Sequence, residues 1–252
     1  MATVRGSKNE MLQRFVNAYG SEASDSLTPE ILVHDTQAGL ACEWYRGDTK
    51  PWSLSVDIES LLGQSKRFPQ PKRGVLSQAL GRKTHTIVDL TAGFGADSLL
   101  FWSQGYQVTM IERHPLLALL LKDAMACLST HPRLNSAATE VPKVIEADAQ
   151  DWLIQSLASQ WDAENGAYDC LYLDPMFPPK RKRSAAPPKK MQFLQWLLGE
   201  QDDAKALANV ALSSGVPRVV IKRPRYAEPL LDNPSERFSG KIIHYDVYLN
   251  HG

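Results

Sequence analysis

Residues 89–97 read D-L-T-A-G-F-G-A-D, and this stretch decides the fold class. It begins inside T-I-V-D-L (86–90), a short apolar run that predicts a buried strand. Gly93 and Gly95 let the backbone turn sharply after that strand and approach a ligand closely. A nicotinamide fingerprint G-x-G-x-x-G would place a third glycine where this chain has Ser98, so the loop disfavours dinucleotide binding.

Beyond this loop, short apolar runs alternate with longer helical ones. We predict further strands at 107–112, 143–147, 169–174 and 218–222, and helices at 96–104, 115–129, 149–160 and 189–212, the last broken near Gly199. This alternation is typical of a doubly wound, mostly parallel α/β sheet. A final run at 241–250 alternates apolar and polar residues, and we expect it to pair as an antiparallel edge strand.

The amino-terminal part of the chain has a different pattern. Three strand-like runs, at 31–35, 40–45 and 52–58, are separated by Q-A-G and G-D-T-K-P turn signals. The sequence therefore predicts a small β-rich subdomain over residues 1–65, followed by the α/β domain over residues 66–252.

The composition excludes several classes of protein. The chain has 252 residues, 43% of them hydrophobic and 22% charged, which are values of an ordinary globular protein. Its formal net charge is 0, so any affinity for nucleic acid has to come from local clusters. The three cysteines show no C-x-x-C spacing and the six histidines no H-E-x-x-H pair, so we expect neither a disulfide framework nor a metal site. We find no membrane-length apolar run and no secretory signal, and expect a cytoplasmic protein.

Acidic residues follow the next two predicted strands. Glu112 ends the second strand, 17 positions after Gly95, and an acid there can accept hydrogen bonds from both hydroxyls of a ribose. Asp148 follows the third strand, where it can meet an adenine edge. Each acid could instead serve only a helix dipole. The ordered set favours a nucleoside cofactor, and Asp89, in the order D-x-x-x-G-x-G, resembles the first motif of class I methyltransferases that use S-adenosylmethionine (SAM).

The fourth predicted strand ends in D-P-M-F (174–177). The carboxylate of Asp174 and the carbonyl of Pro175 can both accept hydrogen bonds from the exocyclic amine of a nucleobase, and Phe177 can stack on an extruded base. We therefore predict these three as catalytic residues. D-P-M-F resembles the [Asn/Asp/Ser]-Pro-Pro-[Tyr/Phe/Trp] motif of amino-group methyltransferases, with Met176 in place of the second proline. The competing interpretation is a stiff strand exit with a buried phenylalanine.

Three runs of positive charge lie near the predicted strand ends. They comprise Lys66, Arg67, Lys72 and Arg73 before the first sheet strand, Lys180, Arg181, Lys182, Arg183, Lys189 and Lys190 after D-P-M-F, and Lys222, Arg223 and Arg225 at the end of the fifth strand. A charge run is often only a solvated loop. Three runs on one rim of a neutral protein are better explained by phosphate contacts. We expect all three at the active edge, and predict that the second and third bind RNA.

Four segments together resemble the ribosomal RNA small subunit methyltransferase J family, over about residues 66–250. They are T-A-G-F-G-A-D (91–97), I-E-R-H-P (111–115), Y-L-D-P-M-F-P (172–178) and V-V-I-K-R-P-R-Y-A (219–227). The resemblance implies a class I methyltransferase fold with a seven-stranded sheet, of which the sequence reveals six strands. It also implies SAM as cofactor, and methylation of N2 of one guanine, guanosine 1516, in 16S rRNA or the small ribosomal subunit.

The resemblance also implies a set of cofactor-binding residues. By motif position they are Ala96, Asp97, Glu112, Arg113, Asp148, Ala149 and Asp174, which join Asp89, Gly93 and Gly95 of the glycine loop. Relatives commonly carry arginine at the position of Ala96, and small hydroxyl residues at those of Asp148 and Ala149. Two alternatives stay open: a SAM-dependent enzyme acting on another base or a protein glutamine, and a non-catalytic RNA-binding factor in ribosome assembly.

Overall fold

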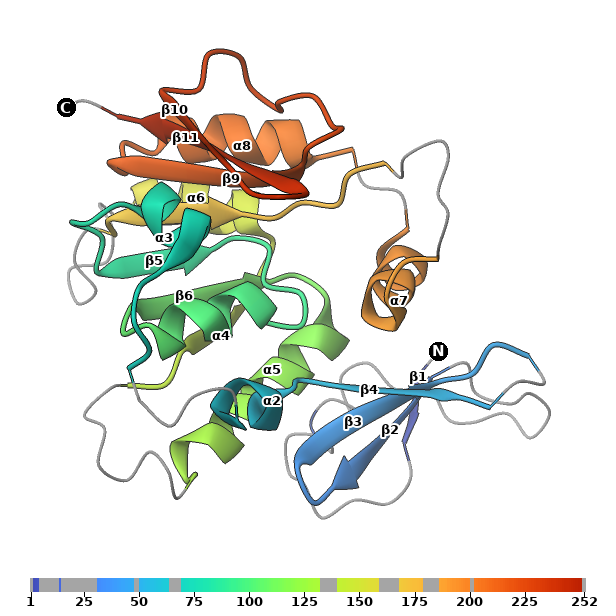
Figure 1. The fold of residues 1–252 in the computed structure, drawn as a ribbon. Coiled ribbons are helices and arrows are strands. Elements are labelled where there is room, and N and C mark those ends of the chain that lie inside the picture. Colours follow the sequence, from blue (N-terminus) through green and yellow to red (C-terminus); the bar gives the residue numbers. More distant parts are fainter. Residues whose placement is uncertain are drawn as a thin grey trace.

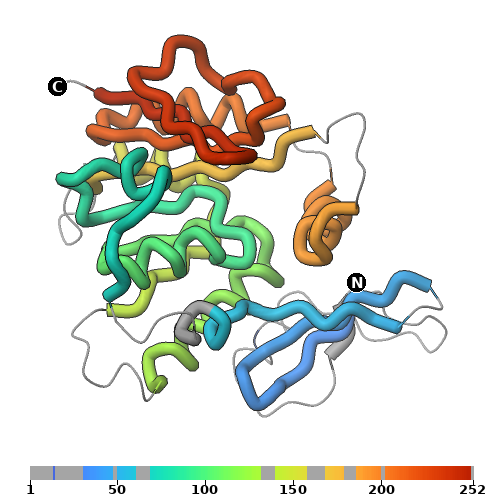
Figure 2. The backbone as a smooth tube through the Cα atoms, viewed as in Figure 1, coloured from blue at the N-terminus to red at the C-terminus, as the bar shows by residue number. Residues whose placement is uncertain are grey.

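The protein was analysed as a computed structural model, drawn as a ribbon in Figure 1 and as a tube in Figure 2. The structure describes residues 2–4, 14, 31–47, 50–63, 69–131, 140–158, 168–178, 186–199 and 202–250. Among these residues no helix is both long and apolar enough to cross a membrane.

A seven-stranded sheet forms the centre of the molecule (Figure 1). Its order is β10-β11-β9-β8-β5-β6-β7, with β5 at Thr86–Asp89, β6 at Gln107–Glu112, β7 at Lys143–Glu146, β8 at Cys170–Leu173, β9 at Arg218–Pro224, β10 at Glu236–Ser239 and β11 at Ile243–Leu249. The neighbours from β7 to β9 pair in parallel, whereas β11 is antiparallel to both β9 and β10. The expected doubly wound, mostly parallel sheet with an antiparallel edge is confirmed.

One strand of this sheet was not found in the sequence. β10 supplies the seventh strand and forms the outer edge, so the expectation that the run at 241–250 lies at the edge is wrong. β11 instead lies second from the edge, because β10 pairs outside it. The β10 segment reads E-R-F-S and is mostly exposed, so it carries almost none of the apolar pattern that marks a buried strand.

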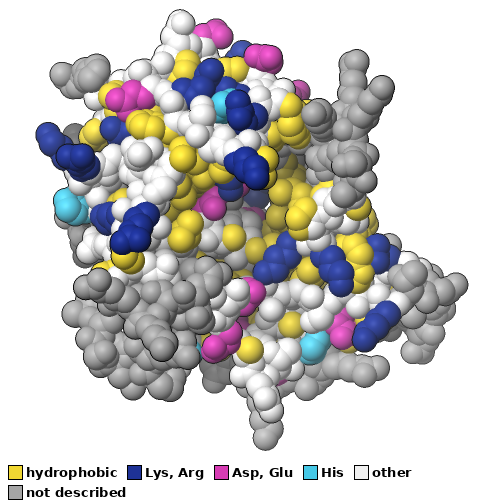
Figure 3. Space-filling view, in the orientation of Figure 1, with side chains coloured by type: hydrophobic (Ala, Val, Ile, Leu, Met, Phe, Trp, Pro, Cys, Tyr) yellow, Lys and Arg dark blue, Asp and Glu magenta, His cyan; other side chains and the backbone are white. Residues whose placement is uncertain are grey.

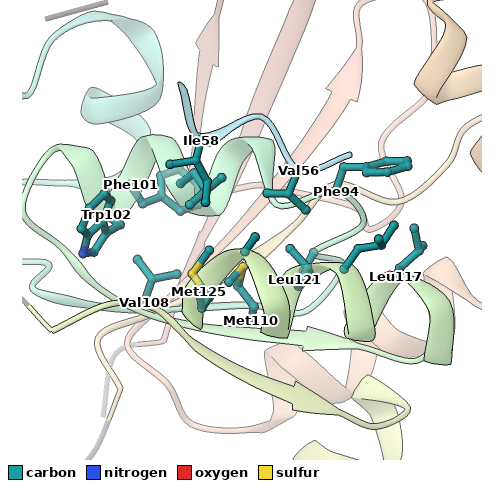
Figure 4. Close-up of a cluster of buried hydrophobic side chains, with 14 of the residues drawn as sticks. Val56, Ile58, Phe94, Phe101, Trp102, Val108, Met110, Leu117, Leu121 and Met125 are labelled. Atoms are coloured by element: carbon teal, nitrogen blue, oxygen red, sulfur yellow. The ribbon is translucent and has the colours of Figure 1, made fainter. Parts of the chain in front are cut away.

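Helices cover both faces of the main sheet. One apolar layer contains side chains of α3 (Gly74–Leu80), α4 (Ala96–Ser103) and α5 (Pro115–Ser129), and the other contains side chains of α6 (Ala149–Ala158) and α8 (Ala204–Ser213). Figure 4 shows part of the first layer, in which Phe101 and Met125 lie around Met110 of the sheet. The predicted helices are confirmed to within a few residues among those the structure describes.

The predicted break near Gly199 is confirmed, and the segment at 189–212 forms two helices. α7 (Lys189–Leu198) ends at Gly199, whose φ of +64° is a conformation that glycine adopts without strain, and α8 begins at Ala204. Figure 1 shows α7 standing apart from the helices that cover the sheet, beside the end of the chain's second, smaller sheet. This position of α7 matters for the site described below.

The smaller sheet is built by the amino-terminal part of the chain. Its order is β1-β2-β3-β4, with β1 at Ala2–Val4, β2 at Ile31–Thr36, β3 at Gly39–Trp44 and β4 at Trp52–Ser55. β2 to β4 are antiparallel, as the turn signals predict, and β1 adds in parallel to β2. A short helix, α2 (Ile58–Gly63), follows β4.

The smaller sheet shares its apolar core with the α/β part. Val56 and Ile58 lie in the same cluster as Phe101 and Met110 (Figure 4). The backbone N–H of Leu40 donates a buried hydrogen bond of 2.6 Å to the Asp123 carboxylate on α5. A domain boundary at residue 65 stays a prediction, since residues 64–68 lie outside the described part of the chain.

Candidate active site

The glycine loop connects β5 to α4 at the carboxyl edge of the main sheet. Gly93 and Gly95 have φ angles of +56° and +72°, and Gly95 is the N-cap residue of α4. A Cβ atom on Gly95 would lie 2.7 Å from Cδ2 of Leu121, closer than real side chains approach. Any other residue at this position would meet both the left-handed backbone conformation and that contact.

Asp89, at the end of β5, holds the start of this loop by hydrogen bonds. Its side chain is buried, and its carboxylate accepts hydrogen bonds from the Thr91 N–H at 3.0 Å and the Ser98 hydroxyl at 2.6 Å. Burial raises the pKa of Asp89 to about 7, against the effect of these two donors. The serine that disfavours a dinucleotide fingerprint therefore has a definite task, which is to hold the acid at the end of β5.

Glu112 ties the end of β6 to the same loop. One carboxylate oxygen accepts the Gly93 N–H at 2.8 Å, and the other accepts the His114 N–H at 2.7 Å. Burial raises the pKa of Glu112, and the two backbone donors and Arg113 oppose that rise. The predicted ribose-type acid thus lies at the strand end, beside the glycine backbone.

Asp148 serves the helix that follows it and also faces the site. Its carboxylate accepts the Gln150 N–H at 2.9 Å and the Asp151 N–H at 3.2 Å, as an N-terminal capping residue does. Arg113 lies 3.7 Å from the same carboxylate and pairs more closely with Asp203. The helix-terminus interpretation of Asp148 is correct, and it does not remove Asp148 from the pocket.

These elements enclose a pocket between the carboxyl ends of β5, β6 and β7. Its lining includes Leu90, Thr91, Gly93, Ile111, Glu112, Arg113, Asp148, Ala149, Asp174, Pro175, Met176, Asp203 and Leu207. Apolar side chains, one glycine backbone and several carboxylates thus surround a single space. This donor set fits a nucleoside, which presents an apolar ring, hydroxyls and polar ring edges. We call it the cofactor pocket.

A lysine links two carboxylates at the boundary of this pocket. Lys222 Nζ on β9 donates to Oδ2 of Asp174 and to Oδ2 of Asp97, each at 2.7 Å. The Tyr172 hydroxyl also donates to Asp97, at 2.5 Å, and the Asp174 N–H donates to the Thr91 hydroxyl at 2.7 Å. The end of β8, the first turn of α4 and the end of β9 are therefore joined through one cation.

The charged groups in this cluster shift one another's pKa values. Burial raises the pKa of Asp174 to about 6, Lys222 opposes that rise, and the neighbouring Asp97 adds to it. For Lys222 burial acts to lower the pKa, but the two carboxylates outweigh it and the pKa is raised. At neutral pH the protonated Lys222 is therefore bound to carboxylates, and the cluster carries more negative than positive charge.

A second cavity opens on the other side of Asp174. Its lining includes Ala92, Phe94, Ala96, Asp97, Phe177, Pro187, Lys190, Met191, Lys222 and Tyr226, and it shares Asp174, Pro175 and Met176 with the cofactor pocket. Figure 3 shows a hollow on this face with apolar walls and charged atoms inside. Phe177 is partly exposed along this cavity, so its interpretation as a buried core residue is wrong. We call this space the substrate cavity.

The structure places the predicted cations in several different environments. Lys180, Arg181, Lys182 and Arg183 lie outside the described residues, as do Lys66 and Arg67. Lys190 lines the substrate cavity, whereas Lys189 and Arg225 are next in sequence to residues of its lining. Lys222 lies inside the site, bound to carboxylates and not on an outer track. Their roles in RNA binding stay predictions.

Two parts of the charge prediction need correction. Arg223 is 3% exposed and pairs with Asp246 at 2.5 Å, so its guanidinium does not reach a phosphate. Lys72 lies over the ring of Tyr106, just before β6 begins, and Arg73 lies in the same hollow. These two cations are therefore at the opposite edge of the sheet from the active site.

Comparisons with known proteins agree with this geometry. A family model described as "Putative SAM-dependent methyltransferase" matches residues 18–250. The ribosomal RNA small subunit methyltransferase J of Coxiella burnetii is 38% identical over 208 residues, which cover 81% of this chain and 77% of that protein. The chain belongs to the methyltransferase J family. The Photobacterium profundum member is 32% identical over 243 residues, covering 94% of this chain and 92% of that protein.

A solved structure also matches the whole chain. The SAM-dependent methyltransferase from Neisseria gonorrhoeae superposes with a TM-score of 0.71 at 25% sequence identity, covering 100% of this chain and 96% of that one. As a member of the methyltransferase J family, the chain is a SAM-dependent methyltransferase. The smaller amino-terminal sheet is included in this match.

Proposed function

We propose that this protein transfers the methyl group of SAM to N2 of one guanine in 16S rRNA. The observation that carries the proposal is the position of Asp174, which lines both the cofactor pocket and the substrate cavity. A group at that boundary can position an amine beside a methyl donor. The relatives are named ribosomal RNA small subunit methyltransferases, which supports RNA as the substrate and the cytoplasm as the site of action.

The cofactor pocket would hold SAM, which supplies a methyl group on a positively charged sulfur. We propose that Glu112 accepts hydrogen bonds from the ribose hydroxyls and that Asp148 and Ala149 meet the adenine edge, with Arg113 holding Asp148 in place. Gly93 and Gly95 let the backbone approach, whereas Asp89 acts through Thr91 and Ser98. Ala96 has only its backbone to offer, and Asp97 acts by holding Lys222.

On the substrate side, Asp174 and Pro175 act on the amine. The lone pair of an exocyclic amine is delocalised into the ring, so hydrogen bonds from its N–H groups to the Asp174 carboxylate and the Pro175 carbonyl help localise that pair on nitrogen. When nitrogen forms its bond to the methyl carbon, the bond from that carbon to sulfur would break with its electron pair left on sulfur, and nitrogen would give up one proton. The Asp174 carboxylate is the acceptor in place for that proton, and the open cavity connects it to solvent.

Aromatic side chains along the substrate cavity would hold the base. Phe177 and Tyr226 both line it, and the Tyr226 hydroxyl donates to the carbonyl of Pro178 at 3.1 Å, which holds the tyrosine against the D-P-M-F turn. Stacking on such rings contributes about 1–3 kcal/mol per base, which helps offset the cost of extruding the guanine. Met176 lies between the two cavities and lines both.

The proposed function is tested by mass spectrometry of 16S rRNA from cells with and without the gene. We expect one guanosine to lose one methyl group on deletion and to regain it when the purified protein is supplied with SAM. Supplying naked rRNA and assembled small subunits in parallel shows which form is the substrate. Methyl label that appears on another base or only in protein would contradict the guanine proposal, and an unchanged rRNA would favour the non-catalytic factor.

The raised pKa of Asp174 predicts an acid limb in the pH profile. The carboxylate is the form that accepts hydrogen bonds, and it is present above its pKa of about 6 and lost as pH falls below that value. We expect kcat/KM to be level above about pH 7 and to fall about tenfold per unit well below the pKa. Steady-state rates across this range check it, and a limb that persists unchanged in Asp174→Asn would assign it to another group.

A further inference from the structure

We propose that α7 and the amino-terminal sheet form a second RNA-contact surface, which binds the single strand flanking the target guanine. The inference rests on the proposed function. The surface consists of Arg46, Trp52, Lys189, Met191 and Trp196, and we call it the tryptophan–cation patch. It would give a task to the amino-terminal part of the chain, for which the sequence alone suggests none.

Cations and aromatic rings alternate in this patch. The guanidinium carbon of Arg46 lies 3.4 Å from the ring centroid of Trp52, and Lys189 Nζ lies 5.2 Å from the same centroid. Trp196 lies 5.1 Å from Trp44, with a tilt of 33° between the rings. Rings flanked by cations are what proteins use for single-stranded nucleic acid, because every base has a face for stacking and every nucleotide carries a phosphate.

Burial separates the patch from an ordinary core cluster. Phe193 on α7 is fully buried, which accounts for the packing of that helix against Trp44 of the small sheet. Met191 and Trp196 on the same helix are 41% and 40% exposed, although side chains of this size are usually covered. The patch is therefore open to a partner on the solvent side of a well-packed helix.

The patch is continuous with the substrate cavity. Lys190 Nζ lies 5.1 Å from the ring centroid of Phe94 in the glycine loop, and both residues line the cavity. Met191 belongs to both the patch and the cavity lining. A strand that places one base beside Asp174 can therefore continue over the amino-terminal end of α7 toward Trp52. Figure 3 shows dark-blue side chains over apolar ones beside the hollow.

Charge favours RNA over a protein partner. Arg46, Lys189 and Lys190 gather here on a chain whose formal net charge is 0. Asp57 is the acidic residue that acts on Lys190, whose pKa burial lowers and Asp57 raises. Among the described residues named here, three cations lie with one acid, a balance that suits a phosphate backbone.

Two variants test the patch. Arg46→Glu combined with Lys189→Glu reverses two of its charges, and Trp196→Ala removes a stacking face. We expect each to weaken binding of a fluorescent rRNA fragment about 5- to 150-fold, the range that corresponds to 1–3 kcal/mol. Affinity for SAM, measured by calorimetry, and kcat at saturating RNA should stay at wild-type values. The charge variant should also flatten the slope of log affinity against log salt by about 1.4, whereas Trp196→Ala leaves the slope unchanged.

A matched charge reversal controls for position. Arg82→Glu with Lys83→Glu makes the same change in charge on exposed residues just before β5, at the opposite edge of the main sheet. Its RNA affinity should equal that of wild type, and circular dichroism should show all variants folded. Equal losses in both charge variants, or wild-type RNA affinity in the patch variants, would overturn the proposal. Failure of the proposed function would appear separately, as wild-type protein that leaves guanine N2 unmethylated.

Discussion

Replacing Asp174 with alanine should lower kcat for guanine methylation about 10²- to 10³-fold, the loss typical when a preorganised hydrogen-bonding group is removed from an active site. Among the described residues, Asp174 is the one whose side chain lines both the cofactor pocket and the substrate cavity and also accepts a bond from Lys222. RNA affinity should stay close to wild type, because the phosphate and stacking contacts are elsewhere. Single-turnover rates with SAM and rRNA at saturation measure this loss.

Asp174→Asn is the informative companion of that variant. Asparagine keeps one carbonyl acceptor of the same size but cannot take up the proton, so its rate should lie between wild type and alanine. It should also lose the acid limb near pH 6. A wild-type rate in Asp174→Ala, with methylation of the same guanosine, would remove Asp174 from the mechanism and leave the Pro175 carbonyl as the acceptor.

Replacing Lys222 with methionine should have the next largest effect. Lys222 Nζ contacts both Asp174 and Asp97 at 2.7 Å, and an opposite charge at such a distance lowers the pKa of a carboxyl by about 1–3 units. Without it the two acids repel, and one holds a proton at neutral pH. We expect the acid limb to move to higher pH by about 1–3 units, which lowers methylation at pH 7 by about twofold to 100-fold.

The pH profile distinguishes this positioning role from a loss of fold. A merely structural defect lowers the rate at every pH, whereas the predicted shift lets activity recover in alkaline buffer. Lys205→Met on the exposed side of α8 is the matched control and should leave the profile unchanged. If Lys222→Met keeps the wild-type limb but loses affinity for RNA, Lys222 is a phosphate contact, as the charge pattern alone suggests.

Much of the fold could be predicted because its central strands are buried on both faces. Runs such as Cys170–Leu173 are continuously apolar and separated by helices, which leaves few alternatives to a parallel sheet. The strand Glu236–Ser239 was not predicted, because an exposed edge strand needs no apolar pattern and is held by backbone hydrogen bonds to β11. The parallel pairing of β1 was also out of reach, since three residues carry no pattern of their own.

The site residues that follow strands could be predicted. Those within a strand could not, because the register of the strand decides which side chains face the site. Gly95, Glu112 and Asp174 stand at carboxyl ends of strands, which converge on one edge in any sheet of this kind. Lys222 and Arg223 are neighbours on β9, so their side chains point to opposite faces. Which of them enters the site depends on the packing around β9, and that information is not in the local sequence.

The small sheet shares its core with α5, and the Leu40–Asp123 bond and the buried Phe193 join it to α5 and α7. The tryptophan–cation patch therefore has a defined position relative to Asp174 in the structure. An RNA strand bound at the patch would therefore place in the active site the nucleotide that lies a set number of positions away. In that arrangement the enzyme would select its guanine partly by the number of nucleotides between that guanine and the RNA segment bound at the patch.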